Sequence, residues 1–318
     1  MNYMELKRKM VGPHVTIVTP WKGRDQELDE AGLRSNVRWL IDQGIVEGTG
    51  VLITGGTNGQ GFAMSPDERK SAAEIVLDEV KVKVPVLVGI SDTSPRIAIE
   101  LARFAQDHGA AGVMSTAPFY FPPNQREIMD YYRMLADAIG IGILAYDISE
   151  VTKKSIDTDS FEELCKIDNV VAIKVGAPME NYARNIVRWG DRLNFLTNAL
   201  FCVGMGYFVG ARGHVTGFGN FVPKLEIALY RAALAKNWEE VRAIEKRRFS
   251  LCECAFAFMD RHGAYAGVEM LNEATEMIGQ LGGIGRPPLS PLDERDRREL
   301  RVALEVCGAR PLTVKVHA

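Results

Sequence analysis

The feature of this 318-residue sequence that most restricts its fold is a repeat of short apolar runs, each followed by a segment with helical periodicity. Runs that alternate with helical segments at spacings of roughly 20–37 residues are typical of strand–helix–strand crossovers. Most of the runs are apolar on both faces, as expected for strands covered by helices on one side and by a packed interior on the other. The predicted strands are His14–Thr19, Val51–Thr54, Val86–Ile90, Gly112–Ser115, Gly142–Tyr146, Val171–Val175, Leu193–Thr197 and His214–Thr216.

Eight such units are what a closed (β/α)8 TIM barrel requires, and we predict this α/β fold for residues 1–235. The main alternative is a doubly wound open sheet, but no G-x-G-x-x-G motif follows the first strand, where the turn reads TPWKGRDQ. Residues 236–318 lack strands and predict a helical appendix that packs on the barrel and does not fold independently. Its expected helices are Trp238–Asp260, Ala264–Gly279 and Leu292–Val306, and those expected within the barrel include Asp29–Gln43, Pro66–Val80, Pro95–His108, Gln125–Ala138 and Leu225–Ala235.

Composition narrows the function class. The net charge of −3 offers no basic surface for nucleic acid and no polybasic membrane patch, and no apolar stretch is long enough to span a membrane. The charged N-terminus does not resemble a signal peptide, and the odd number of cysteines fits reduced thiols. We therefore expect a cytoplasmic enzyme. The histidines show no H-x-x-x-H or H-x-H spacing, so no metal site is expected.

Two segments at the carboxyl ends of the predicted strands carry candidate chemistry, because a barrel places its active site there. Gly55–Phe62 reads GGTNGQGF, and successive backbone N–H groups in such a turn can hold a carboxylate or phosphate. The alternative is a tight turn that needs glycine only for its backbone angles. Lys174 lies within the apolar run VVAIKVG, where burial would produce a neutral amine able to form a Schiff base. The alternative is a lysine that reaches solvent or an ion pair.

Two further segments are compatible with a site but less specific. Tyr146 ends the fifth predicted strand and would transfer protons if its hydroxyl points into the barrel mouth, although a tyrosine at a strand end often serves packing. The segment Ala117–Pro123, APFYFPP, is an aromatic loop restrained by prolines. It predicts a pocket wall, an oligomer contact or simply local packing.

Taken in order, these motifs resemble the dihydrodipicolinate synthase / N-acetylneuraminate lyase family of class I aldolases over about residues 11–300. The likeness rests on V-T-P-W after the first strand, GGTNGQGF for G-x-[ST]-[ST]-G-E, and APFYFPP for the T-P-Y-Y loop. It continues with LAYDIS for L-Y-N-x-P, AIKVG for the lysine strand and GARGHVTGFGN for the closing strand, which ends at Thr216.

The resemblance implies a role for each matching position. Lys174 would be the Schiff-base lysine and Tyr146 the proton-transferring phenol. Thr57 and Asn58 fall on paired hydroxyl residues that hold the keto acid's carboxylate and relay protons, which makes Thr57 a further expected catalytic residue. Gly56, Gly59 and Thr216 complete the expected substrate-binding set. Tyr120 matches an aromatic residue that reaches across a dimer interface. The implied activity is a lyase acting on pyruvate or another 2-keto acid without metal or organic cofactor, in a homo-oligomer arranged as a dimer of dimers.

Several positions depart from the family pattern and predict an altered pocket for the second substrate. Val151 replaces the arginine that grips a carboxylate in dihydrodipicolinate synthase, and Ser149 replaces a proline. Leu200 and Phe201 replace acidic residues of sialic acid lyases and, with Phe62 and Phe119, suggest a less polar partner. The alternatives left open are dihydrodipicolinate synthase itself, a hydratase-aldolase, a keto-deoxy sugar acid dehydratase, a non-catalytic keto-acid-binding homologue and an unrelated barrel enzyme with a phosphate site.

Overall fold

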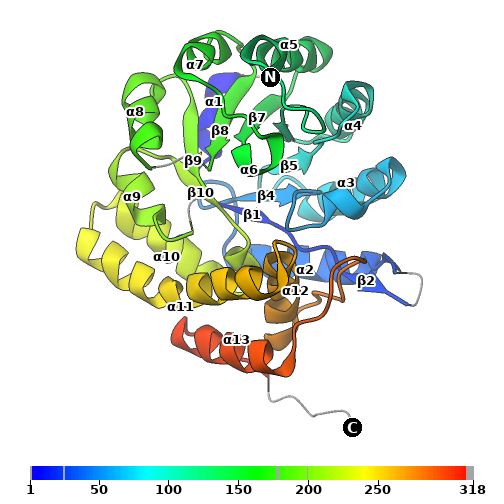
Figure 1. Ribbon diagram of the computed structural model, residues 1–318, viewed down its shortest axis with the longest axis vertical. Helices are drawn as coiled ribbons and strands as arrows, with labels where there is room; N and C mark the ends of the chain where they lie inside the picture. Colours follow the sequence, from blue (N-terminus) through cyan, green and yellow to red (C-terminus); the bar gives the residue numbers. More distant parts are fainter. Residues whose placement is uncertain (1, 24–25, 177–178, 199, 313–318) are drawn as a thin grey trace.

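Eight parallel strands close into a barrel, which confirms the predicted TIM-barrel fold (Figure 1). The computed structural model describes residues 2–23, 26–176, 179–198 and 200–312. Around the barrel each strand pairs in parallel with its neighbours, and β1 closes the ring by pairing with both β4 and β10. The barrel strands are β1 (Gly12–Thr16), β4 (Val51–Thr54), β5 (Val86–Gly89), β6 (Gly112–Thr116), β7 (Gly142–Asp147), β8 (Val170–Val175), β9 (Asn194–Thr197) and β10 (Gly213–Thr216).

Helices form the outer layer, and they begin where local signals predict. Pro66 opens α3 behind Ser65, whose side chain caps the helix in a reciprocal capping box with Glu68. Asn124 and Glu127 form the same arrangement at the start of α5. The outer helices are α2 (Glu30–Asp42), α3 (Pro66–Val80), α4 (Pro95–Asp107), α5 (Gln125–Ala138), α6 (Ser149–Thr152), α7 (Thr158–Leu164), α8 (Met179–Trp189), α9 (Val203–Phe208) and α10 (Pro223–Leu234), with the 3-10 turns η1 (Gly61–Ala63) and η2 (Phe218–Asn220).

The first strand is shifted relative to the prediction of His14–Thr19. It begins at Gly12, whose N–H donates to the carbonyl of Arg212, and it ends at Thr16. Beyond Thr16, Ile17 N–H makes one more bond to β4 by donating to the Ile53 carbonyl, and Val18 N–H then donates to Asn220 Oδ1 in the turn η2. The apolar residues at positions 17 and 18 are therefore buried without extending the strand.

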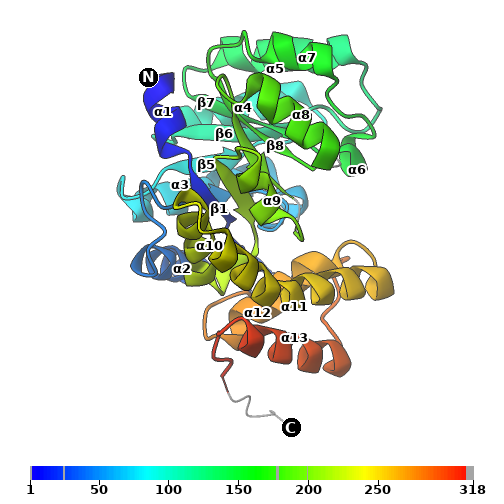
Figure 2. The ribbon, with the colours of Figure 1, turned by 90° about the vertical axis from the view of Figure 1, so that its left-hand side faces the viewer.

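A short N-terminal helix, α1 (Tyr3–Lys9), closes one end of the barrel and was not predicted. Its Leu6 and the following Met10 are buried in the same cluster as the inward-facing strand residues Leu144 and Leu196. Figure 2 shows α1 and α6 at opposite ends of the barrel. A two-stranded hairpin of β2 (Trp21–Lys22) and β3 (Glu27–Leu28) was also not predicted.

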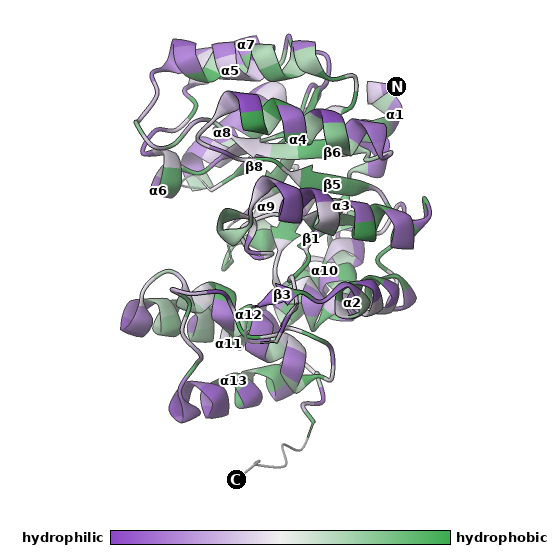
Figure 3. Cartoon of the chain, turned by 90° about the vertical axis from the view of Figure 1, so that its right-hand side faces the viewer, coloured by the Kyte–Doolittle hydropathy of each residue, from purple (hydrophilic) through white to green (hydrophobic). Residues whose placement is uncertain are grey.

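Three helices follow the barrel: α11 (Trp238–His262), α12 (Ala266–Met277) and α13 (Glu294–Val306). They pack together beside α10 and project toward the side of the barrel that carries α6 (Figure 2). Their outer surfaces are mixed in polarity, whereas β5 and β6 are largely hydrophobic (Figure 3). That this extension does not fold alone stays a prediction, and its residues 313–318 lie outside the described part of the chain. In the described part, no helix is long and apolar enough to cross a membrane.

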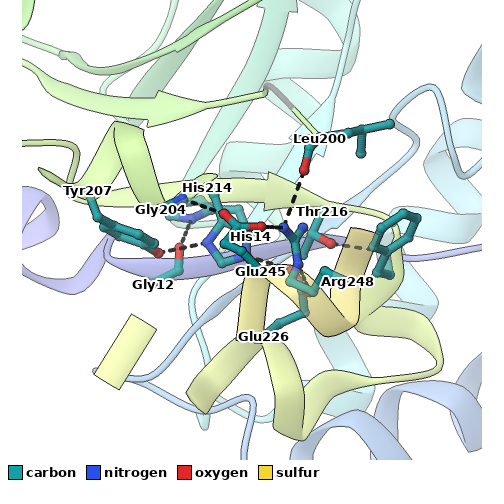
Figure 4. A network of polar contacts seen from close by, with 12 residues as sticks. Gly12, His14, Leu200, Gly204, Tyr207, His214, Thr216, Glu226, Glu245 and Arg248 are labelled. Carbon is teal, nitrogen blue, oxygen red and sulfur yellow. Dashed lines mark hydrogen bonds and ion pairs between the residues drawn. The ribbon is translucent and has the colours of Figure 1, made fainter. Parts of the chain in front are cut away.

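A buried network of charged groups joins α11 to the barrel (Figure 4). His214 on β10 binds Glu226 of α10 over 2.7 Å, and Arg248 of α11 donates to the other oxygen of Glu226 over 2.7 Å. Arg248 also donates to Glu245 and to the carbonyl of Leu200, in the loop after β9. Burial alone would raise the pKa of Glu226, but Arg248 and His214 hold it well below its usual range.

We predict that Arg248→Met lowers the free energy of unfolding by about 3–5 kcal/mol, because it leaves the buried Glu226 carboxylate without its cation. Denaturant unfolding would measure the loss. The control is Arg242→Met, which removes an exposed arginine of the same helix and should change stability by less than about 0.5 kcal/mol. Equal stability of the two variants would show that the network does not hold α11 in place.

Candidate active site

Lys174 and Tyr146 face each other inside the barrel near the carboxyl ends of their strands. They are register partners on the adjacent strands β8 and β7, so both side chains point to the same face of the sheet. The Lys174 Nζ lies 3.8 Å from the centre of the Tyr146 ring. The two side chains are only 6% and 5% exposed. The sequence-predicted amine and phenol are thus brought together in one buried position.

Burial sets the ionisation of both groups. Desolvation lowers the pKa of Lys174 to about 7, and within the described residues no carboxylate forms an ion pair with it. A large share of this amine is therefore neutral near pH 7, which is the form that attacks a carbonyl carbon. Burial and the nearby Glu150 carboxylate raise the pKa of Tyr146 well above its usual value, so its hydroxyl keeps its proton.

The side chains around the Tyr146 hydroxyl come from two neighbouring loops. Asn198, just after β9, donates its amide to the Tyr146 oxygen over 3.5 Å. Glu150 lies in α6, the short helix after β7, and Gly176 follows β8. A Cβ atom placed on Gly176 would lie 3.8 Å from Asn198 Nδ2 and 3.9 Å from Glu150 Oε2. An amide and a carboxylate thus flank the same point at the barrel mouth.

The predicted glycine-rich turn lies at the end of β4 and packs tightly against β1. A Cβ on Gly56 would lie 2.7 Å from Thr16 Cγ2, and one on Gly59 would lie 2.6 Å from the carbonyl oxygen of Ile17. The Thr19 hydroxyl anchors the turn by donating to the Gly59 carbonyl over 2.7 Å. Close approach to the Ile17 backbone therefore requires Gly59, and close approach to the Thr16 side chain requires Gly56, whether or not the turn also binds an anion.

The remaining predicted binding residues lie at the same end of the barrel. Thr57 is exposed at the tip of the turn, and its hydroxyl makes no hydrogen bond within the described residues. Asn58 lies next to the loop after β10, since its Nδ2 is 2.8 Å from the position of a Cβ on Gly217. The Thr216 hydroxyl accepts the N–H of Phe218 and so supports the 3-10 turn η2. Their roles in substrate binding stay predictions.

The aromatic loop after β6 projects into solvent. Tyr120 is 78% exposed and packs edge-on against the equally exposed Phe121. Neither ring contacts Lys174 or Tyr146 among the interactions of the described residues. The role of Tyr120 across a dimer interface therefore stays a prediction, for which its exposure leaves the ring accessible.

Three polar residues of the mouth were not among the predicted site residues: Thr116, Glu150 and Asn198. Thr116 ends β6 as the register partner of Tyr146, and its buried hydroxyl has no hydrogen-bond partner in the described part of the chain. Its position at a strand end in the segment GVMST was the signal that could have revealed it. Asn198 lies in a loop and Glu150 in the four-residue helix α6, and both segments are too short for sequence periodicity to indicate side-chain direction.

The apolar residues that suggested a less polar partner lie mainly against the C-terminal helices. Phe201 stacks on Phe256 of α11, with ring centres 5.0 Å apart, and Phe62 lies 5.5 Å from the ring of Tyr265. Val151 of α6 is 44% exposed. These contacts give Phe62 and Phe201 packing partners within the chain, and the less polar pocket stays a prediction.

Other candidate sites lack comparable chemistry. A groove of about 420 Å³ lies at the opposite end of the barrel between α1 and the loops that precede β5 and β6. Among the described residues, His262, Asp293 and Asp296 form the one group with metal-ligand spacing. Their atoms are already used, because Asp296 binds His262 and Arg261 while Asp293 caps α13.

A buried lysine with a lowered pKa beside a tyrosine, at the carboxyl ends of the strands of a TIM barrel, is typical of an enzyme that uses the lysine amine as a nucleophile. Residues 9–307 match the Dihydrodipicolinate synthetase family, and the chain belongs to this family. The resemblance drawn from the motifs is confirmed. The chain is accordingly a lyase of the aldolase type that characterises the family.

Relatives and solved structures agree with this assignment. The chain is 30% identical over 304 residues to the 4-hydroxy-tetrahydrodipicolinate synthase of Syntrophobacter fumaroxidans, covering 93% of this chain and 98% of the relative. It is 30% identical over 308 residues to that of Nitrobacter hamburgensis, covering 96% and 99%. The dihydrodipicolinate synthase structure from Oceanobacillus iheyensis superposes with a TM-score of 0.86 at 25% identity, covering 96% of this chain and 98% of that chain. A chloride-inhibited synthase from Acinetobacter baumannii, complexed with pyruvate, gives 0.85 at 24% identity, covering 95% and 100%.

We predict that the rate of pyruvate adduct formation rises with pH and levels off with a midpoint near pH 7, because the amine must lose its proton to attack. Trapping with cyanoborohydride at a series of pH values would measure it. Asp147, on the opposite face of β7, has a pKa that burial raises to about 7, so Asp147→Asn serves as the control and should leave the midpoint unchanged. A midpoint above pH 9 would contradict a desolvated amine.

The same shift affects folding stability. The pKa of Lys174 is lower in the folded than in the unfolded chain, so its contribution to stability is present above pH 10.5 and is lost as the pH falls toward 7.

Proposed function

We propose that the protein is a Schiff-base-forming lyase acting on pyruvate or a 2-keto acid that contains it. The observation that carries the proposal is the buried Lys174 amine, unpaired with any carboxylate of the described residues and 3.8 Å from the Tyr146 ring centre. An ammonium group at such a position would be costly, so the site favours the neutral nucleophile. Membership in a family of aldolase-type lyases supports the same chemistry.

In the proposed reaction, neutral Lys174 attacks the C2 carbonyl of the keto acid, a water molecule leaves, and a protonated imine forms. The imine accepts the electron pair released when a C3–C4 bond or a C3–H bond breaks, which gives an enamine. In the synthetic direction the enamine carbon bonds to an aldehyde carbon, the aldehyde oxygen takes up a proton, and water then releases the product. The imine is itself the electron sink, so the proposal needs neither metal nor organic cofactor.

The other predicted residues take supporting roles in this proposal. Tyr146, protonated and held by Asn198, donates and recovers the protons of the carbinolamine and of the reacting oxygen. The turn Gly56–Gly59, with Thr57 and Asn58, holds the keto acid's carboxylate, and Thr216 contributes from the end of β10. Tyr120 completes the site of a neighbouring subunit in a dimer of dimers, and the assembly works in the cytoplasm.

Several candidate activities share the Schiff-base chemistry and differ in the second substrate. Dihydrodipicolinate synthase activity itself is supported by the names of the relatives, but Val151 stands where the family pattern has a carboxylate-binding arginine. A hydratase-aldolase and a keto-deoxy sugar acid dehydratase remain the other catalytic candidates. A non-catalytic keto-acid-binding protein is a further alternative, for which Asn58 and Gln60, which depart from the family pattern, are the motivating features.

We predict that borohydride reduction in the presence of pyruvate modifies Lys174 covalently, and that Lys174→Ala abolishes the adduct. Peptide mass analysis would locate the modified residue. Lys153→Ala provides the matched control, because Lys153 is an exposed lysine near the mouth whose amine binds the Glu150 carbonyl, and its loss should leave the adduct intact. Absence of any adduct, or an adduct that survives in Lys174→Ala, would end the Schiff-base proposal.

We predict that Tyr146→Phe slows proton transfer by about 100-fold or more while changing the yield of pyruvate adduct by less than about threefold, since the ring stays and only the hydroxyl is lost. Exchange of the pyruvate methyl protons with deuterated water, followed by NMR, requires no second substrate. Tyr3→Phe, at the opposite end of the barrel, is the control. Equal losses of adduct and exchange would assign Tyr146 a binding role instead.

A further inference from the structure

The rim of the barrel mouth above Lys174 carries an uncompensated negative charge. Glu150 projects from α6, and its carboxylate oxygen is 3.9 Å from the point where a Cβ on Gly176 would lie. The adjacent Lys153 amine donates to the backbone carbonyl of Glu150 and forms no ion pair with its carboxylate. Within the described residues, Glu150 forms no ion pair.

The charge of Glu150 acts on the site itself. Its field is one of the causes that raise the pKa values of Tyr146 and of Asp147, after burial in both cases. The negative charge of Glu150 therefore influences the ionisation of residues at the carboxyl end of β7. A second negative charge brought to the same place by a substrate would be repelled in the same way.

Asn198 supplies the complementary hydrogen-bonding group. Its Nδ2 is 3.8 Å from the same point on Gly176 and 3.5 Å from the Tyr146 hydroxyl. An amide donor and a carboxylate acceptor within 4 Å of one point match a hydroxyl group, which both accepts and donates. Together the two residues form a polar rim over the reacting amine.

We propose that Glu150 and Asn198 determine the second substrate, selecting a neutral, hydroxyl-bearing aldehyde fragment and rejecting one that carries a carboxylate at its far end. This inference rests on the proposed Schiff-base function and narrows it to the sugar-acid class of substrates. An aromatic aldehyde fits less well, because Phe62 and Phe201 have ring partners in the C-terminal segment. A substrate carboxylate would find Val151 where a cation would be needed, with Glu150 beside it.

The experiment compares glyceraldehyde with succinate semialdehyde as the aldehyde, each with pyruvate, by kcat/KM for product formation. For the native protein we expect a preference for glyceraldehyde of about tenfold or more. Glu150→Gln removes the charge and should narrow this preference about fivefold, chiefly by improving succinate semialdehyde, and Glu150→Arg should reverse it. Glu74→Gln removes an exposed carboxylate of the outer helix α3 and should leave the ratio within about twofold.

Borohydride trapping with pyruvate alone, run on every variant, separates the two proposals. An adduct in all variants together with an unchanged substrate ratio in Glu150→Gln would overturn the rim assignment and leave the Schiff-base function standing. An adduct without turnover of glyceraldehyde would overturn the rim assignment as well. Absence of the adduct in the native protein would overturn both.

Discussion

The desolvation of one amine is the constraint around which the mouth of the barrel is organised. Lys174 lies inside a closed ring of strands, next to Tyr146 and Leu196 in register, and no described carboxylate compensates its charge. Burying an ammonium group in this way opposes folding, so the rest of the barrel must supply the difference. The same desolvation lowers the pKa of Lys174 to about 7, so that a large share of the amine is neutral and nucleophilic near this pH. Stability and reactivity are opposed at this residue.

The C-terminal helices contribute to the mouth through the barrel's loops. Arg248 of α11 and the thiol of Cys252 both donate to the carbonyl of Leu200, in the same loop that brings Asn198 to the Tyr146 hydroxyl. The guanidinium is held in turn by Glu226, which also binds His214 on β10 (Figure 4). A buried ionic network of this kind is a weak source of net stability but fixes geometry, because removal of any partner leaves a charge without compensation. The extension thus helps to position the loop that supports the phenol.

The sequence was sufficient for the barrel and for its central pair of residues, but not for the rim. Strand and helix periodicity predicted all eight barrel strands because burial on both faces leaves uninterrupted apolar runs. Lys174 could be identified as a candidate because it is a charged residue within such an apolar run. By contrast, α1 is too short to show a clear period, and the direction of Asn198 and Glu150 depends on loop geometry, which tertiary contacts determine. The less polar second-substrate pocket stays a prediction, because Phe62 and Phe201 pack on the extension and such residues look the same in sequence as residues that line a cavity.

The helix α1 closes the end of the barrel opposite the mouth, with Leu6 and Met10 packed among the inward-facing strand residues. Lys174 is therefore closed off from that end, and any molecule that reaches or leaves it must pass the carboxyl end of the strands, where Asn198 and Glu150 lie. In the proposed reaction, the water expelled when an imine forms would leave by the path along which the aldehyde arrives. An aldehyde bound before the keto acid would block its way to Lys174, so the proposed function implies an order of binding and inhibition by excess second substrate.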